Sequence, residues 1–228
     1  MSERLGRSVP GWEGAAPVTP STSKGRWVEI VPLASGHVPG LWEAFSGAGD
    51  RLWDYMSYGP FASREDLSRL IEEWEGSIDP VFFAFVVQKR PVGWGSYLRA
   101  VPAMGTVEVG HLAFAPRLQR TTAATEAMYL MARRAFDDLG YRRYEWKCDD
   151  LNEASRRAAE RFGFTYEGTF RSHMVYKGRN RDTAWYAITD DEWPQLRHAY
   201  EQWLEPSNFD ETSRQLRSLG EVRSQGHS

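Results

Sequence analysis

Three apolar runs in close succession constrain the fold of this chain more than any other feature. The first, Val81 to Val87, is continuous and rich in Val and Phe, which is typical of a buried strand. Gln88 to Pro91 then supplies a short turn, so the second run, Val92 to Leu98, is expected to return antiparallel to the first. The third run, Gly105 to Phe114, ends before Pro116, because proline cannot donate to a sheet ladder. The sequence therefore predicts a sheet built around consecutive antiparallel strands.

Helical patterns precede and follow these strands. Ser63, with Asp66 three residues later, predicts a capping box before apolar residues at helical spacing. Further helices are expected at 37–48, 122–139, 152–162 and after Thr189. Strands are expected at 27–31, 144–148, 164–168, 174–177 and 183–188. Interleaved helices and mostly antiparallel strands predict an α+β fold with a central sheet flanked by helices, and no internal period indicates a repeat architecture.

The length and the hydrophobic content allow one folded domain. The chain has 228 residues, of which 41% are hydrophobic, enough to build a core. Residues 1–24 are rich in Gly, Ser, Pro and Thr without apolar periodicity, which predicts a flexible N-terminal arm. The folded domain is expected over 25–206, and residues 207–228 become polar again, which predicts a mobile C-terminal tail.

Charge and cysteine usage exclude several classes of protein. The 28 Lys and Arg residues against 31 Asp and Glu residues give a net charge of −3, so no overall positive field favours nucleic acid. The single Cys148 excludes an intramolecular disulfide and a cysteine metal cluster, and no metal site is expected. No apolar run reaches the roughly 18 residues of a membrane helix, and the N-terminus lacks a signal peptide, so we expect a cytoplasmic protein without a membrane partner. A homodimer is left open.

The segment around Pro116 has the order strand, turn, helix, with small residues where the helix begins. The first backbone N–H groups of a helix have no partner within it and lie at the positive end of the helix dipole. A pyrophosphate can satisfy several of them at once, and small side chains let it approach. This pattern predicts an anion-binding turn over Ala115 to Ala124.

At this turn the sequence resembles the GNAT family of N-acetyltransferases. Gln119 and the run Thr125, Glu126, Ala127 are similar to the family's pyrophosphate turn and the helix that follows it. Leu139 to Tyr141 and Asn152, Ser155, Gly163 and Phe164 are similar to its next strand and helix, so the resemblance covers Trp27 to Ile188. Trp94 to Ser96, Gly168, Phe170 and Arg171 also resemble the branch of ribosomal-protein N-terminal acetyltransferases.

The resemblance implies a GNAT-type fold and acetyl-CoA as the acyl donor. It implies that the donor is bound by Leu112, Phe114, Gln119, Arg120, Thr121, Thr122, Ala123, Ala124, Thr125 and Asn152, with Leu112 and Phe114 acting through their backbones on pantetheine. The turn departs from the family's pattern, because Arg120 and Thr122 stand at usual glycine positions and only Ala124 is small as expected.

The same resemblance suggests three catalytic candidates. Glu108 stands where the family often has a carboxylate that accepts the amine proton, and His111 is its neighbour. Three residues apart on an extended strand, these two point to opposite faces and can line the same cleft only through a β-bulge, so only one is expected to be catalytic. Ala159 replaces the family's usual tyrosine acid, and Ser155 is therefore the candidate that hydrogen-bonds the leaving sulfur.

The acceptor and some alternatives are left open by the sequence. The acceptor is expected to be an amine, either of a small molecule or of a protein N-terminus, and Tyr55, Tyr58, Phe61, Trp94, Tyr97, Trp146 and His173 are candidates to line its cleft. A non-catalytic acyl-CoA sensor or interaction module is the alternative that the altered turn and the absent tyrosine favour. A dinucleotide-binding oxidoreductase is disfavoured, because the chain has no Gly-x-Gly-x-x-Gly motif.

Overall fold

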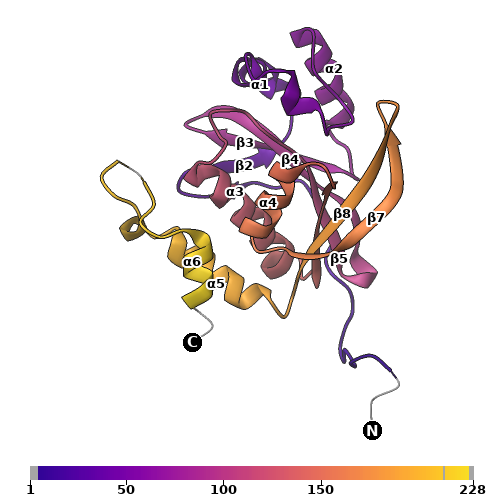
Figure 1. Ribbon diagram of the computed structural model, residues 1–228, viewed down its shortest axis with the longest axis vertical. Helices are drawn as coiled ribbons and strands as arrows, with labels where there is room; N and C mark the ends of the chain where they lie inside the picture. The colour runs from indigo at the N-terminus through magenta and orange to yellow at the C-terminus, as the bar shows by residue number, and fades with distance from the viewer. Residues whose placement is uncertain (1–4, 213, 226–228) are drawn as a thin grey trace.

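One sheet of eight strands runs through the protein, with helices on both of its faces (Figure 1). The structure is a computed structural model that describes residues 5–212 and 214–225. In chain order the strands are β1 (Ser23–Lys24), β2 (Glu29–Pro32), β3 (Val81–Val87), β4 (Arg90–Val101), β5 (Thr106–Phe114), β6 (Arg143–Asp149), β7 (Thr165–Tyr176) and β8 (Arg179–Thr189). Their spatial order is β1-β2-β3-β4-β5-β6-β8-β7, with antiparallel neighbours except for the parallel pair β5 and β6. The predicted α+β fold is confirmed.

The α-helices of the described residues are α1 (Val38–Phe45), α2 (Arg64–Trp74), α3 (Thr122–Arg133), α4 (Glu153–Arg161), α5 (Trp193–Trp203) and α6 (Leu219–Gln225). The predicted capping box is present at the start of α2, where Ser63 Oγ accepts from the backbone N–H of Asp66 at 3.1 Å. After α3 the chain continues through a short π-helix, Arg134–Asp138, and Gly140 follows with a left-handed φ of 74°. Within the described ranges, none of the helices combines the length and the apolar content needed to cross a bilayer.

The apolar run of β3 is continuous because both faces of the sheet are covered. Val81, Phe83 and Phe85 belong to the core that includes residues of α3 and α5. Phe82 and Ala84 belong to the core under α1 and α2. Side chains alternate between the faces of a strand, so a strand between two helical layers needs apolar residues at every position.

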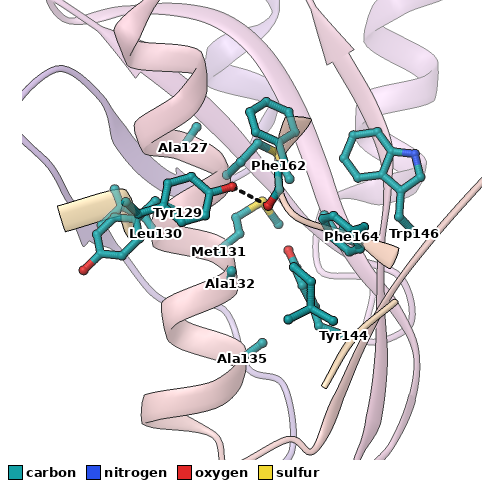
Figure 2. Packing of buried hydrophobic residues seen from close by; sticks show 14 of the residues in the cluster. Ala127, Tyr129, Leu130, Met131, Ala132, Ala135, Tyr144, Trp146, Phe162 and Phe164 are labelled. Atoms are coloured by element: carbon teal, nitrogen blue, oxygen red, sulfur yellow. Dashed lines mark hydrogen bonds between the residues drawn. The ribbon is translucent and has the colours of Figure 1, made fainter. Parts of the chain in front are cut away.

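Helix α3 packs on the sheet through small side chains. Figure 2 shows Ala127 of α3 and Ala135 of the π-helix that continues it on the side that faces Tyr144 of β6 and the ring of Phe164. Small residues let the helix backbone approach the sheet, and the aromatic rings fill the remaining space. This packing determines where the N-terminus of α3 lies relative to β5 and β6.

The pairing between β5 and β6 ends before the two strands do. It joins Thr106–Val109 to Arg143–Trp146, although β5 continues to Phe114 and β6 continues to Asp149. β5 stays paired with β4 as far as Phe114, so the two parallel strands diverge in their second halves. Helix α3 follows β5 and helix α4 follows β6, and both helices therefore begin beside the point of divergence.

The N-terminal segment differs from the flexible arm expected over 1–24. The backbone N–H groups of Ala15 and Ala16 donate to the carbonyls of Pro102 and Leu139 at 2.9 and 2.8 Å. Strand β1 pairs with β2 at the edge of the sheet. Apolar periodicity does not predict such hydrogen bonds, because they join backbone groups of the segment to backbone groups of the domain and do not depend on side-chain type. The first four residues of the expected arm lie outside the described residues.

The C-terminal segment likewise differs from the mobile tail expected over 207–228. Asn208 is buried, and its Nδ2 donates to a backbone carbonyl at the end of α5 at 3.0 Å. Leu219 and Val222 of α6 are buried within the core shared with α5. Two apolar residues three apart are enough to seat one face of a short helix, although the surrounding sequence is polar. Residue 213 and the last three residues lie outside the described residues, and the packed chain extends beyond the expected 25–206 at both ends.

Candidate active site

A cavity of about 960 Å³ lies where β5 and β6 diverge. Its wall also includes the first turns of α3 and α4, the segment 51–58 between α1 and α2, and residues of β7 and β8. The predicted catalytic residues Glu108, His111 and Ser155 all line it. So do the predicted cofactor residues Leu112, Phe114, Gln119, Arg120, Thr121, Thr122, Ala124, Thr125 and Asn152, whereas Ala123 is buried and is not part of the wall.

The turn between β5 and α3 keeps an anion-binding shape without its usual glycines. Arg120 adopts a left-handed φ of 60°, a conformation that glycine adopts without steric cost. Thr121 caps α3: its Oγ1 accepts from the N–H of Ala124 at 3.2 Å and donates to the carbonyl of Leu118 at 2.7 Å. The earlier N–H groups of the first turn have no acceptor within the helix and lie at its positive end. The turn therefore fits the pyrophosphate that the sequence predicts there.

The second half of β5 offers a free backbone edge to the cavity. Beyond Val109 no strand pairs with this edge in the described structure, and Leu112 and Phe114 of this stretch line the cavity. A free edge can pair with the amides of a ligand as it would with another strand. The carbonyl of Phe114 already accepts from Nε2 of Gln119 at 2.9 Å. Leu112 is therefore better placed than Phe114 to bind a pantetheine amide through its carbonyl.

Glu108 is a buried carboxylate held by two cations. Its Oε2 lies 2.6 Å from Nη1 of Arg99 and 2.9 Å from Nζ of Lys147. Lys147 also lies 2.8 Å from Oε2 of Glu145, and its side chain is buried. These ion pairs compensate charges that burial would otherwise leave without partners. Both pairs of Glu108 are made to Oε2, while Oε1 lies next to Gly110 on the cavity wall.

A β-bulge brings His111 to the same cavity as Glu108. The register of β5 with β4 shifts by one residue between Gly110 and Ala113, and His111 has a left-handed φ of 51°. The two residues were expected to line one cleft only if a bulge interrupted the strand, and this bulge places both of them on the cavity wall. The ring of His111 is stacked on Tyr58, with 5.8 Å between ring centres. Burial, reinforced by the nearby Arg99, lowers the pKa of His111 to about 4, so the imidazole is neutral at pH 7.

Ser155 lies on another part of the wall, in the first turn of α4. Asn152 caps this helix by accepting the backbone N–H of Ser155 on Oδ1 at 3.1 Å. Trp146 Nε1 donates to Ser155 Oγ at 3.0 Å, so the hydroxyl keeps its own proton for donation. Burial raises the pKa of the neighbouring Cys148 thiol, and a hydrogen bond with Ser155 acts in the opposite direction. Cys148 is therefore a neutral thiol rather than a nucleophile, and Ser155 is a donor placed beside a sulfur atom.

Two side-chain hydrogen bonds tie the segment 51–58, part of the cavity wall, to segments that precede α4 and follow β7. Lys177, at the turn between β7 and β8, donates through Nζ to the carbonyl of Trp53 at 2.8 Å. Tyr55 donates through Oη to the carbonyl of Leu151, between β6 and α4, at 3.1 Å. These contacts fix the position of the segment 51–58, which contributes Tyr55 and Tyr58 to the cavity wall.

The aromatic candidates for the acceptor cleft divide between the cavity and the cores. Tyr55, Tyr58, Trp146 and His173 line the cavity. Trp94 and Tyr97 are instead buried in the two cores, and Phe61 packs against the core under α1 and α2. A buried tryptophan or tyrosine contributes mainly apolar area, which composition does not distinguish from a role in binding.

Sequence reasoning missed the cations that accompany Glu108. Lys147 and Glu145 are two residues apart on β6, so their side chains share a face of the sheet, and this signal was present in the sequence. Arg99 reaches Glu108 because Leu98 pairs with Glu108 across β4 and β5. The register of that pairing is set by the fold and was not visible in the residue pattern.

A family model described as an acetyltransferase (GNAT) domain matches residues 28–165. This range contains Glu108, His111, Ser155 and the turn before α3. The chain belongs to the GNAT family of acetyltransferases. Members of this family use acetyl-CoA, and the free edge of β5 and the first turn of α3 are suited to its pantetheine amides and its pyrophosphate.

Solved GNAT structures share this architecture. The structure of a GCN5-related N-acetyltransferase from Brucella melitensis is 40% identical, with a TM-score of 0.93, over 95% of this chain and 100% of that chain. The structure of a probable GNAT-family acetyltransferase from Chromobacterium violaceum is 37% identical, with a TM-score of 0.78, over 83% of this chain and 96% of that chain. A search of curated proteins returned no match.

Two more distant structures show the shared fold alone. A microcin self-immunity acetyltransferase in complex with acetyl-CoA and AMP is 18% identical, with a TM-score of 0.65, over 72% of this chain and 93% of that chain. An acetyltransferase from Salmonella typhimurium that modifies the N-terminal serine of a 50S ribosomal subunit protein is 19% identical, with a TM-score of 0.62, over 72% of this chain and 96% of that chain. The resemblance to the ribosomal-protein branch therefore stays a prediction.

Proposed function

We propose that this GNAT protein transfers the acetyl group of acetyl-CoA to an acceptor amine by direct attack in a ternary complex. The observation that carries this proposal is the convergence on one cavity of a compensated carboxylate, Glu108, a hydroxyl donor, Ser155, and the anion-binding turn before α3. When bound, acetyl-CoA supplies the acetyl group as a thioester. The residues of this chain bind it, orient it and move the protons.

Binding is divided between backbone and side-chain groups. The first-turn N–H groups of α3 hold the pyrophosphate, with Arg120 adding a positive charge beside it. The backbone of Leu112 pairs with a pantetheine amide along the free edge of β5. Asn152 caps α4 and lines the same cavity, so it orients Ser155 toward the thioester. Holding the two reactants together supplies much of the rate acceleration.

Two groups on different walls handle the protons. Oε1 of Glu108 accepts the proton that the acceptor amine loses as its nitrogen bonds to the acetyl carbon, directly or through one water molecule. Ser155 donates its hydroxyl proton to the sulfur as the carbon–sulfur bond breaks, so that CoA leaves as a thiol. Ser155 then regains a proton from solvent, and Glu108 releases the amine proton to solvent. His111 is neutral and borders the same space, where it accepts a hydrogen bond from the amine.

The acceptor class is an amine of a small molecule or of a protein N-terminus. The segment 51–58, held by the hydrogen bonds of Lys177 and Tyr55, places Tyr55 and Tyr58 on the wall of the same cavity as Glu108. Both classes carry the reacting amine, and the distant acetyltransferase from Salmonella typhimurium modifies an acceptor of the second class.

Calorimetric titration with acetyl-CoA, followed by turnover assays, tests this proposal. We expect binding in the micromolar range or tighter and acetylation of at least one amine in a panel that includes small amines and peptides with free N-termini. Binding without turnover on any amine would favour an acyl-CoA sensor instead. Absence of binding to both acetyl-CoA and CoA would overturn the proposal itself.

A further inference from the structure

The cavity extends past the first turn of α3 to a wall built mostly by the C-terminal part of the chain. This wall is lined by Arg161, Phe162, Trp203, Phe209, Arg214 and Gln215. The family match ends at residue 165, so the last four of these lie outside the matched domain. The donor and acceptor chemistry described above uses none of them.

Arg161 is a cation placed next to the turn that holds the pyrophosphate. Its Nη2 donates to Oγ1 of Thr125, in the first turn of α3, at 3.0 Å. Its guanidinium carbon lies 5.2 and 5.6 Å from the ring centres of Phe162 and Trp203. Among the described residues no carboxylate lies within 4 Å of it, and partial burial lowers the pKa of Arg161. A guanidinium that is open to solvent and has no carboxylate partner is suited to an anionic group of a ligand.

The segment after α5 is held in place beside Arg161. The ring of Phe209 lies 5.2 Å from that of Trp203, edge to face. Gln215 Oε1 accepts from Nε1 of Trp203 at 3.1 Å, and Phe209 and Gln215 form a β-bridge. The backbone N–H of Arg214 donates to Oδ1 of Asp210 at 2.9 Å. These contacts form a loop that carries Arg214 to the cavity wall.

The order of groups along CoA determines which of them reaches this wall. With the thioester at Glu108 and Ser155 and the pyrophosphate at the first turn of α3, the group beyond the pyrophosphate is the ribose, which carries the adenine and the 3′-phosphate. Arginines recognise phosphates through paired N–H groups, and aromatic rings provide flat apolar surface for a base.

We propose that Arg161, together with Arg214 of the C-terminal segment, forms a subsite for the 3′-phosphate of CoA. This inference rests on the proposed function, because it requires CoA to lie in the cavity with its thioester at Glu108. The subsite makes the C-terminal segment part of the donor site, and it makes the 3′-phosphate a determinant of donor affinity.

Calorimetry with CoA and with 3′-dephospho-CoA tests the subsite on the full chain. We expect the unmodified protein to bind CoA at least about tenfold more tightly than 3′-dephospho-CoA, which corresponds to about 1.4 kcal/mol. Arg161→Gln and Arg214→Gln should each reduce this ratio by weakening CoA binding while leaving the affinity for 3′-dephospho-CoA unchanged. A purely structural role would weaken both ligands equally and keep the ratio.

Arg157→Gln is the matched control, because Arg157 lies one turn earlier on α4, is exposed, and forms an ion pair with Glu153 at 2.9 Å. This variant should keep the full ratio. Equal affinity of the unmodified protein for the two ligands would overturn the subsite and leave the proposed function standing. A ratio that persists in both Arg161→Gln and Arg214→Gln would overturn the assignment to these residues, and failure of both ligands to bind would overturn the subsite together with the proposed function.

Discussion

Glu108 and His111 lie three residues apart on β5 and line one cavity, but their surroundings are opposite in kind. Glu108 is buried among charges, with Arg99 and Lys147 both on its Oε2. His111 is surrounded by rings, among them that of Tyr58, and it loses its positive charge to burial. The comparison shows that the position along the strand does not determine chemical character, because neighbours from other strands and loops supply the environment.

Arg99 connects these two environments. It forms the ion pair with Glu108, and its charge contributes to the lowered pKa of His111. One cation therefore contacts an anion and lies near a neutral imidazole in the same cavity, and this supports the proposal that Glu108 accepts the proton and His111 accepts a hydrogen bond. The following three predictions test the assignment, beginning with the largest expected effect.

Removing the cation that Glu108 shares with Glu145 should cause the largest change. Lys147→Met should lower the free energy of unfolding by about 3–5 kcal/mol, because it leaves buried carboxylates with fewer compensating charges. Urea denaturation followed by tryptophan fluorescence measures this loss. Arg197→Met is the control: it breaks surface ion pairs with Asp137 and Glu201, and its cost should be below about 1 kcal/mol. Similar losses in the two variants would show that the charges around Glu108 are not coupled as described.

Removing the charge of Glu108 itself should mainly affect turnover. Glu108→Gln keeps the shape of the side chain but cannot accept the proton, so turnover should fall by about a hundredfold or more while the affinity for acetyl-CoA stays the same. Steady-state kinetics and calorimetry measure the two quantities. Glu145→Gln removes a carboxylate that contacts the same Lys147 without lining the cavity, and it should retain turnover within a few-fold. Full turnover in Glu108→Gln would contradict the role of Glu108 and would indicate that His111 accepts the proton instead.

The neutral state of His111 should appear as a smaller effect on acid stability. Its pKa is about 4 in the folded protein and near 6.5 when unfolded, so the unfolded chain binds the extra proton as the pH falls from 6.5 to 4. The folded state therefore loses stability in this window. Between pH 6.5 and 5, His111 should account for a loss of at most about 2 kcal/mol in the free energy of unfolding. His111→Asn should abolish this part of the loss, and asparagine tolerates the left-handed φ at this position. Identical pH profiles of unfolding free energy for the two proteins would mean that burial does not exclude the charged ring.

The elements of the fold were largely predictable because their signals are local. The predicted strand Val81 to Val87 coincides with β3, and the capping box at Ser63 begins α2 as expected. The turn before α3 was located from residue order alone, and Thr121 caps the helix where that turn ends. Such signals depend on residues within a few positions of each other, which is the range over which side-chain periodicity and capping act.

The terminal segments were not predictable in the same way. Residues 1–24 and 207–228 were expected to be flexible because they carry little apolar periodicity, yet their described parts contact the domain through backbone hydrogen bonds, β1 and α6. Arg214 therefore reaches the cavity from a segment that seemed unrelated to the site in sequence. Whether a segment with a short apolar face or free backbone groups packs on the domain depends on the surface available to it. That surface is formed by parts of the chain that are distant in sequence.

The sequence by itself determined the kinds of element, their order, and the residue types available at the site, because each is encoded by neighbouring residues. Tertiary structure alone decided that a bulge turns His111 toward the cavity of Glu108, that Arg99 and Lys147 compensate Glu108, and that β5 and β6 diverge to open the cavity. The physical reason is that ion pairing, desolvation and strand register depend on groups that are far apart in sequence and meet only when the chain is folded.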